Sequence, residues 1–386
     1  MNGVCSIFSQ MLRVFSRAEF EQAVREHGAE HHARGFSSWT QLVAMLFCHL
    51  GKAQSLREIC GGLAACEGKL KHLGVEGSPK RSTLAYANEH RPWQLYQTVF
   101  EQLLKKCQGE VREGKKFRFK NKLLSLDGSV IDLSVTMYDW AKFRQTKGGV
   151  KLHLLLDHDG YLPKFAVIEP AIKPEIEVAR KLALEPGTIV VFDRGYTDYK
   201  WFASLTSQGV YFVTRQRWNS YFTVEKESPV RPGSDIVSDQ IVMLGHRSYR
   251  TGVSVRRVVK RDPETGKDVV FLTNKLDLAA TTIAEIYRDR WQIETFFKAL
   301  KQSLRVKTFV GTSANALKTQ IWTALIAMLI LKYLKLKSSF PWSLSNLVAL
   351  LRQQLFVYRD LWTWLDCPFE PPPALEGIHD QFRLAF

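Results

Sequence analysis

The sequence predicts an α/β protein in which a mixed β-sheet is flanked by helices. Two apolar runs, "KLLSLDGSVIDLS" and "GTIVVFDRGY", have the pattern of strands that lead into an aspartate. Between them, apolar runs on both sides of Asp159-Gly160 predict a hairpin, because this dipeptide favours a tight turn. The helical segments "PEIEVARKLAL" and "WFASLTSQG" then alternate with later strands. Strands joined by helical crossovers are typical of a mixed α/β sheet.

Residues 1 to 110 are expected to form an N-terminal helical domain. Ser37 or Ser38 is placed to cap the helix "SSWTQLVAMLFCHL", and Gly61-Gly62 is expected to stop the short helix "SLREICGGLAA". Another helical stretch follows Ser78-Pro79. A helical packing module without a ligand and a DNA-binding domain are both compatible with this pattern. The basic residues expected on its surface are Lys80, Arg81, His90 and Arg91.

The rest of the chain divides into two further regions. A basic linker, residues 111 to 122, leads to the α/β region at residues 120–340. Within it, residues 217 to about 276 contain strand-like segments and the turn sequences "RPG" and "DPETGKD", which predict a β-rich insertion. Residues 341–386 form a C-terminal helical tail, which is a candidate for dimerisation or DNA contacts.

The charge balance is strongly basic. The 386 residues include 54 Lys and Arg against 38 Asp and Glu, a formal net charge of +16. These cations are spread along the chain, so they belong to a folded surface and not to a tail. Such a surface favours a polyanionic partner, although a merely basic soluble protein would show the same balance. Hydrophobic residues make up 45% of the chain, enough to bury a sizeable core.

Cysteine usage and hydropathy favour a reduced, cytoplasmic protein without a membrane segment. The six cysteines form no CxxC pair, and no signal peptide is recognisable. The most apolar run, "IWTALIAMLILKYL", is shorter than the ~20 residues that span a bilayer, so it predicts a buried helix. A zinc site is an alternative, but the lack of a CxxC or HExxH motif favours solvated or structural histidines. Its candidates are His27, His31, His32, Cys60 and Cys66.

Asp127 and Asp193 are the first candidates for chemistry. Each directly follows an apolar strand, where the sheet holds the backbone in place. If the two strands are neighbours, the carboxylates converge and repel each other. A divalent cation such as Mg²⁺, which prefers oxygen ligands, would relieve this repulsion. Taken singly, "LDG" and "FDRG" are also ordinary turn sequences.

The segment "YRDRWQIETFFKALKQSLRV" (287–306) predicts a helix with a polar stripe beside its buried face. At about 100° per residue, Arg290, Glu294 and Lys301 lie within about 60° of Tyr287. The stripe borders the apolar residues, so its groups would emerge at the rim of a cleft. Glu294 is therefore a candidate third metal ligand, whereas an i,i+4 ion pair with Arg290 is the structural alternative. The residues expected to be buried are Ile286, Trp291, Ile293, Phe297, Leu300 and Leu304.

These three blocks together resemble a known family. The spacing Y-x2-R-x3-E-x6-K is the signature of bacterial insertion-sequence transposases of the DDE class, and the chain is similar to the insertion-sequence-four group. "SLDGSVIDLS" resembles the first-Asp block, and "VVFDRGYTDY" resembles the D-R-x-x-x-D block of the second Asp. "YDWAKFRQTKGGVKLHLLLD" and "YFVTRQR" are similar as well. The start of the chain resembles the helical domain often attached to this group.

The resemblance implies an RNase H-like fold and a metal-dependent DNA transposase, both endonuclease and strand transferase. Its triad falls on Asp127, Asp193 and Glu294, which would hold two Mg²⁺ ions, with Mn²⁺ able to substitute. The expected reaction nicks the terminal inverted repeats of a mobile element, frees the element and joins its 3′-OH ends to target DNA. A homodimer across both ends is expected, and a hairpin intermediate is implied by the resemblance alone. The DNA-binding candidates are Tyr287, Arg290, Lys301, Arg194 and Lys298.

Some assignments stay open. Arg194 could contact a phosphate or pair with its neighbour Asp193. Members of the family hold a flipped base with aromatics of the insertion, for which burial in the core is the favoured alternative here. An RNase H-like nuclease would share the metal site without strand transfer, and a DNA-binding relic would not cleave. The aromatic candidates are Trp218, Tyr221, Phe222 and Tyr249.

Overall fold

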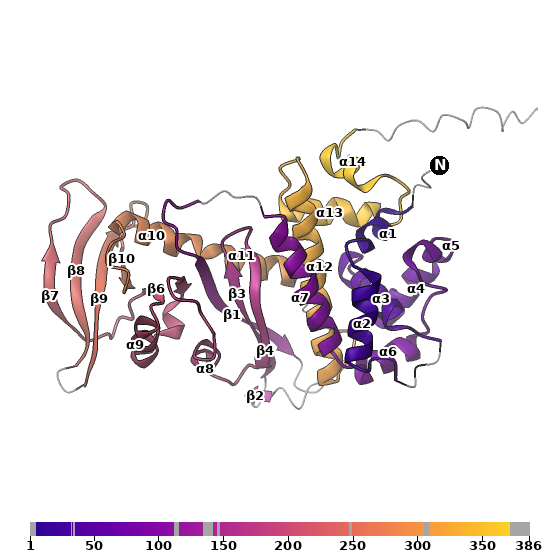
Figure 1. Cartoon of the computed structure of the whole chain (residues 1–386), viewed down its shortest axis with the longest axis horizontal. Coiled ribbons are helices and arrows are strands. Elements are labelled where there is room, and N and C mark those ends of the chain that lie inside the picture. Colours follow the sequence, from indigo (N-terminus) through magenta and orange to yellow (C-terminus); the bar gives the residue numbers. More distant parts are fainter. Residues whose placement is uncertain are drawn as a thin grey trace, which may run out of the picture.

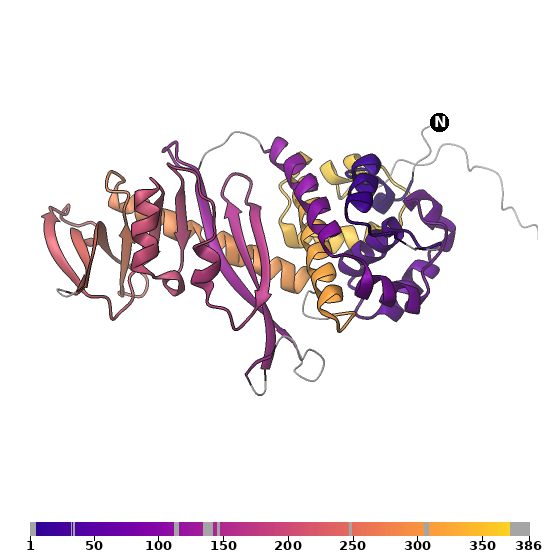
Figure 2. The ribbon, with the colours of Figure 1, turned by 60° about the horizontal axis from the view of Figure 1, so that its bottom comes forward.

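A computed structural model describes residues 5–31, 33, 35–111, 116–133, 142–144, 147–246, 249–304 and 309–370 of the chain. The molecule is elongated, with a helical half beside a sheet half (Figure 1). The turned view shows the helical half against one end of the sheet (Figure 2). His32, residues 138–141 and 145–146 of the block "YDWAKFRQTKGGVKLHLLLD", and the tail beyond 370 lie outside the described residues.

The N-terminal part is helical, as expected. Serine hydroxyls begin several of its helices, since Ser16, Ser37 and Ser55 each accept a hydrogen bond from the backbone N–H three residues on. Ser37, not Ser38, is therefore the cap. The helices are α1 (Ile7–Leu12), α2 (Arg17–Glu26), α3 (Ser38–Leu50), α4 (Leu56–Ala64), α5 (Glu67–Leu70), η1 (Lys71–Leu73), α6 (Arg81–His90) and α7 (Gln94–Gly109).

The expectation that Gly61-Gly62 stops a helix is wrong. Both glycines lie inside α4, which runs on to Ala64. A methyl group at Gly62 would lie 2.7 Å from the Phe47 ring of α3. The glycine therefore allows α4 to pack closely on α3, and this contact outweighs its low helix propensity.

The expected exposure of Arg91 is also wrong, since only 9% of its surface is accessible. Its guanidinium donates hydrogen bonds to Gln41 Oε1 at 3.2 Å and to the carbonyl oxygen of Phe36. Arg91 thus holds α3 and the preceding loop together instead of facing a partner. Lys80, Arg81 and His90 are exposed, as expected.

The C-terminal helices share the core of the N-terminal ones. α12 (Ala314–Lys337) packs between α3, α6 and α7. Within the described part of the chain it is the one helix long and apolar enough to cross a membrane, yet 83% of its most apolar window is buried inside the protein. The predicted buried helix is thus confirmed. α13 (Leu344–Gln354) and α14 (Leu361–Asp366) complete this half, and the Ile7 N–H donates to the carbonyl of Val357 at 3.0 Å.

The sheet follows the predicted order of strands. β1 pairs antiparallel with β3 and parallel with β5, and β5 pairs parallel with β6. β3 and β4 form the hairpin expected at Asp159-Gly160. α8 (Glu175–Ala179) and α9 (Tyr199–Ser207) make the crossovers. The strands are β1 (Leu123–Leu133), β2 (Lys142–Arg144), β3 (Lys147–Asp157), β4 (Leu162–Pro170), β5 (Ile189–Phe192) and β6 (Tyr211–Arg215).

The predicted β-rich insertion continues the same sheet. The strand order is β2-β3-β1-β5-β6-β10-β9-β8-β7, with β4 paired to β3. Gly233, at φ +76°, lies in the turn before β8, and Asp262 accepts a backbone hydrogen bond from Gly266 in the turn after β9. The inserted strands are β7 (Phe222–Ser228), β8 (Ile236–His246), β9 (Tyr249–Arg261) and β10 (Asp268–Thr273).

The polar helix predicted at 287–306 is divided into segments. α10 (Ala280–Asp289) ends just before Arg290, α11 (Trp291–Lys298) begins after it, and a π-helical turn, η4 (Ala299–Ser303), follows. Trp291 was expected to be buried but is 63% exposed, because it lies on the outer side of α11. The expected apolar residues are buried: Ile286, Ile293, Phe297, Leu300 and Leu304.

Candidate active site

Asp127 and Asp193 lie at the same level of two neighbouring strands. The parallel pairing of β1 with β5 ends at Leu126 and Phe192, and each aspartate is the next residue. Asp193 follows the end of its strand, as expected. Asp127 does not, because β1 runs on to Leu133 through its pairing with β3. The sheet therefore opens beside Asp127 on the β5 side only.

Arg290 joins Asp127 to Glu294. Its Nη1 lies 3.5 Å from Asp127 Oδ2, and its Nη2 lies 2.6 Å from Glu294 Oε1. The guanidinium carbon is 5.4 Å from the centre of the Tyr287 ring. The predicted i,i+4 ion pair is present, but its Arg290 side chain is buried and also connects α11 to β1. Tyr287, Arg290, Glu294 and Asp127 are thus brought together.

The electrostatics of Asp127 depend on burial and on its charged neighbours. Burial raises the pKa of this carboxyl to about 7, against the opposing effects of Arg290 and of the Gly128 N–H, which donates to Asp127 Oδ1 at 2.8 Å. Asp193 and Glu294 raise it further. Both acidic neighbours therefore lie within electrostatic reach, and like charges at close range disfavour ionisation.

This donor set suits a hard divalent cation. Asp127, Asp193 and Glu294 offer only carboxylate oxygens, the ligands that Mg²⁺ prefers. Among the residues described, no group of three His, Cys, Asp or Glu is already arranged around a single point. In this structure Arg290 lies between Asp127 and Glu294 and offsets their charge. His27, from the zinc alternative, instead bonds Thr98 Oγ1 at 2.8 Å.

The remaining DNA-binding candidates lie around this edge. Lys301, in η4, donates from Nζ to the carbonyl of Val130 on β1 at 2.6 Å. Lys298 and Arg194 are exposed. The Arg217 guanidinium donates to the carbonyls of Arg194 and Gly195 at 2.8 and 3.0 Å. The loop after Asp193 is thereby tied to the loop that precedes β7.

The aromatic candidates of the insertion differ in exposure. Trp218 is 91% exposed and Tyr221 68% exposed, so burial in the core is wrong for both. Tyr221 lines a groove of about 550 Å³ together with Lys200 and Arg217. Phe222 packs against the core beside the Arg257 guanidinium, as the alternative predicted. The side chain of Tyr249 lies outside what the structure describes.

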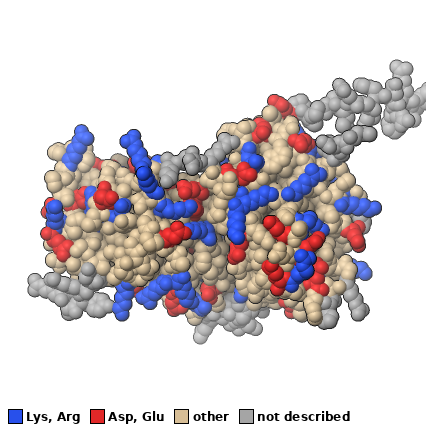
Figure 3. Space-filling model, in the orientation of Figure 1, with Lys and Arg blue, Asp and Glu red and all other residues tan. Residues whose placement is uncertain are grey.

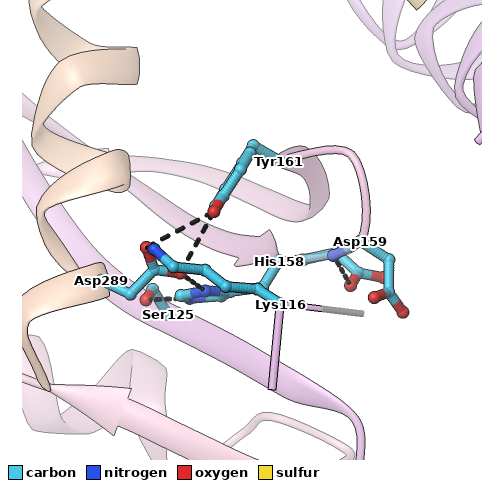
Figure 4. Close-up of polar contacts among 7 residues, drawn as sticks. Lys116, Ser125, His158, Asp159, Tyr161 and Asp289 are labelled. Atoms are coloured by element: carbon cyan, nitrogen blue, oxygen red, sulfur yellow. Dashed lines mark hydrogen bonds and ion pairs between the residues drawn. The ribbon is translucent and has the colours of Figure 1, made fainter. Parts of the chain in front are cut away.

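A polar network that no sequence motif predicted holds the helix end beside Asp127. Asp289, the last residue of α10, accepts hydrogen bonds from His158 Nδ1 at 2.6 Å, from Tyr161 at 3.2 Å and from Lys116 (Figure 4). His158 Nε2 lies 2.7 Å from Ser125 Oγ on β1. The order Ser–His–Asp is that of a hydrolase triad, but Ser125 has no accessible surface to meet a substrate.

This network is a brace. Asp289 precedes Arg290, and Ser125 lies two residues before Asp127 on the same face of β1. The network therefore fixes the position of Arg290 relative to Asp127. The one available sequence signal for this network was the charged Asp289 in "YRDR". Its partners could not be predicted from the sequence, because they come from the linker and the β3–β4 turn.

Basic side chains lie on both halves of the molecule. On the face shown in Figure 3, Lys and Arg are interspersed with Asp and Glu and extend over the sheet half and the helical half. The positive charge is thus a property of the folded surface, as the sequence predicted, and it is available to a long polyanion.

Comparisons with known proteins agree with these features. Residues 119–330 match the family model of a transposase DDE domain, and residues 5–76 match a domain of unknown function (DUF4372). The chain is 28% identical over 333 residues to a putative transposase, y4zB, of Sinorhizobium fredii, covering 84% of this chain and 90% of that one. It is also 28% identical to a probable transposase for insertion sequence element IS5377 of Geobacillus stearothermophilus, with 66% and 67% covered.

A solved structure of the piggyBac transposase synaptic complex with hairpin DNA is also similar. It has a TM-score of 0.45 and 10% identity, with 90% of this chain and 79% of that one covered. This likeness is too low to carry an argument.

The brace generates a prediction about acid stability. Burial favours the neutral form of Asp289, but hydrogen bonds from His158 and Lys116 outweigh it and lower its pKa to about 2. A carboxyl with a depressed pKa stabilises the fold above its unfolded-state value of about 3.9, and this stability is lost as the pH falls through the folded value. We expect the free energy of unfolding of Asp289→Asn to fall less steeply between pH 4 and 2 than that of the wild type.

Urea unfolding at a series of pH values measures this difference. The matched control is Asp132→Asn, an exposed position on β1 that should keep the wild-type slope. Equal slopes for Asp289→Asn and the wild type would mean that the network does not hold Asp289 in its charged form.

Proposed function

The chain belongs to the transposase DDE-domain family and is a DNA transposase, and we propose that Asp127, Asp193 and Glu294 are its catalytic carboxylates. The observation that carries this proposal is the common level of Asp127 and Asp193, with Glu294 joined to Asp127 through Arg290. Enzymes of this class depend on divalent metal. The RNase H-like sheet supplies the edge at which these side chains lie.

We propose Mg²⁺ as the metal, with two ions shared by the three carboxylates. Asp127, Asp193 and Glu294 would hold these ions, which would supply activation of a water or 3′-OH and stabilisation of the leaving 3′ oxygen. The protein supplies the oxygen donors, and the sheet keeps Asp127 and Asp193 in register. Mn²⁺, which accepts the same ligands, is expected to substitute.

The cations beside the carboxylates suit the DNA backbone. Arg290 now balances Asp127 and Glu294, and its planar guanidinium also matches a phosphate. The Lys301 ammonium, which donates to the carbonyl of Val130 on β1, adds a second positive charge at the same edge. Trp218 is exposed next to the loop that Arg217 ties to Arg194, which favours a role on an unstacked base.

The helical domain is proposed to bind the ends of the element. α6 buries Leu84, Ala87 and Asn88 and leaves its other face exposed. That outer face carries Tyr86, 65% exposed and stacked on the His90 ring at 3.9 Å, with Lys80 and Arg81 at its start. Cations with an exposed aromatic fit contact with DNA.

A second copy of the chain is also part of this proposal. Cutting both ends of an element together requires two active sites, so a homodimer assembled on DNA in the cytoplasm is the simplest arrangement. The tail is a candidate for the dimer contact, since Phe369 is 75% exposed beyond α14.

The decisive experiment uses a plasmid with a marker between the DNA ends that flank this gene. Incubation with the purified protein in Mg²⁺ should release the marker and join it to a second plasmid, whereas Ca²⁺ should support binding without cleavage. Cleavage without joining would favour a nuclease, and binding without cleavage in Mg²⁺ or Mn²⁺ would favour a DNA-binding relic.

Glu294→Gln should keep end binding and lose cleavage. It removes one metal ligand, so the loss should exceed the roughly 100-fold that removal of an outer-shell partner costs. Cleavage and gel-shift assays on the same substrate measure the two properties. Glu285→Gln, at an exposed position of α10, is the matched control. Normal cutting by the Glu294 variant would remove this residue from the triad.

Removing Lys80 and Arg81 together should weaken end binding and flatten its salt dependence. Each lost phosphate contact reduces the log–log slope by about 0.9. Fluorescence anisotropy at several salt concentrations gives this slope. The control pair, Lys226→Ala with Lys267→Ala on the insertion, should have a smaller effect. An equal effect of both pairs would mean that the start of α6 is only general surface charge.

A further inference from the structure

A fourth carboxylate lies beside Asp193. Glu175 is the first residue of α8, and the loop after Asp193 packs against it. A methyl group at Gly195 would lie 2.8 Å from Asp193 Oδ1 and 3.1 Å from Glu175 Oε2. Glycine at this position therefore lets both carboxylate oxygens approach one point. The Gly195 N–H also donates to Asp193 Oδ1 at 2.7 Å, which fixes that carboxylate.

Lys151 holds Glu175 from the other side. Its Nζ lies 3.1 Å from Glu175 Oε1, and the side chains are only 12% and 26% exposed. Lys151 is on β3, paired in register with Val130 of β1. The ion pair thus attaches α8 to the strand pair that carries Asp127 and leaves Glu175 Oε2 directed to Gly195. A half-buried pair of this kind contributes geometry more than stability.

Tyr196 supplies an independent observation. The side chain is fully buried, yet its hydroxyl has no hydrogen-bond partner within the described part of the protein. Burial first, and then the charges of Glu175, Asp127 and Asp193, raise the pKa of this hydroxyl. It therefore lies within electrostatic reach of the carboxylates. A buried donor without an acceptor is rare in folded proteins and indicates a partner such as a bound water.

Asp127 and Glu294 share Arg290, and Glu175 pairs with Lys151, whereas Asp193 forms no ion pair among the described residues. A hydrated divalent cation at Asp193 would supply positive charge there, and Mg²⁺ keeps several of its waters when a protein binds it.

We propose that Glu175 is a positioning residue of the catalytic edge, whose Oε2 accepts a hydrogen bond from the hydration shell of metal at Asp193, with the Tyr196 hydroxyl donating to the same water layer. Glu175 acts through this water and is not a metal ligand. The inference rests on the proposed function of Asp193. Groups that orient metal-bound water set metal affinity and the direction of attack.

The test measures metal binding as well as activity, on the full chain. Free Mn²⁺ is counted by electron paramagnetic resonance, and cleavage of a transposon-end duplex is followed against Mg²⁺ concentration. Glu175→Gln should weaken Mn²⁺ affinity and raise the half-saturating Mg²⁺ concentration by about 10- to 100-fold. Glu177→Gln, exposed on the same helix, should leave both unchanged. Wild-type affinity and Mg²⁺ dependence in Glu175→Gln would overturn the proposal.

Two further variants decide the case if Glu175→Gln does not fold. Tyr196→Phe removes only the orphan hydroxyl, and Gly195→Ala places a methyl group between the two carboxylates. Weaker Mn²⁺ binding by Tyr196→Phe supports the proposal and wild-type affinity overturns it, whereas Gly195→Ala also contacts Asp193 Oδ1 and reports on the metal site as a whole. Asp193→Asn separates the two levels of inference. If this variant binds Mn²⁺ normally, the proposed metal site itself is wrong, whatever Glu175 does.

Discussion

The structure of this transposase depends on acidic side chains that converge where β5 stops beside β1. The negative charges of Asp193 and Glu294 disfavour ionisation of Asp127, so the fold must supply positive charge to keep these carboxylates together. Arg290 does this, since its guanidinium bonds both Asp127 and Glu294 and lies on the Tyr287 ring. Its interactions also explain why a helix with a large apolar face carries a polar stripe along the border of that face.

The position of Arg290 is set by elements far from it in sequence. The Asp289 network joins the end of α10 to β1, to the β3–β4 turn and to the linker. On the other side, His49 of α3 bonds the carbonyl of Leu304 at 3.2 Å and Thr323 of α12 at 3.0 Å. The helical half thus holds Leu304 at the end of η4, and the sheet holds the segment before α11. A movement of either half would therefore change the position of Arg290.

Several expectations failed for a common reason: the outcome at each position was decided by its place in the tertiary structure, which the local sequence does not show. Gly61-Gly62 is a helix stop by propensity, but contact with Phe47 keeps it inside α4. Arg91 is an exposed cation by composition, but Gln41 and the Phe36 carbonyl bury it. Trp291 belongs to the apolar set, but it faces outward from α11. The inserted strands could be predicted, but not their continuation of the central sheet through β10.

Periodicity and turn chemistry in the sequence determined the strands, the hairpin at Asp159-Gly160 and the apolar face of α11, because these follow from contacts between near neighbours in the chain. The placement of Tyr287, Arg290, Glu294 and Lys301 on one side of the helical segment likewise follows from their spacing in the sequence and from helix geometry. Only the tertiary structure decided that Asp127 and Asp193 share a level, that Ser125, His158 and Asp289 form a brace, and that Glu175 meets the same edge. These placements depend on strand register and on contacts across long stretches of chain, and no local pattern encodes either.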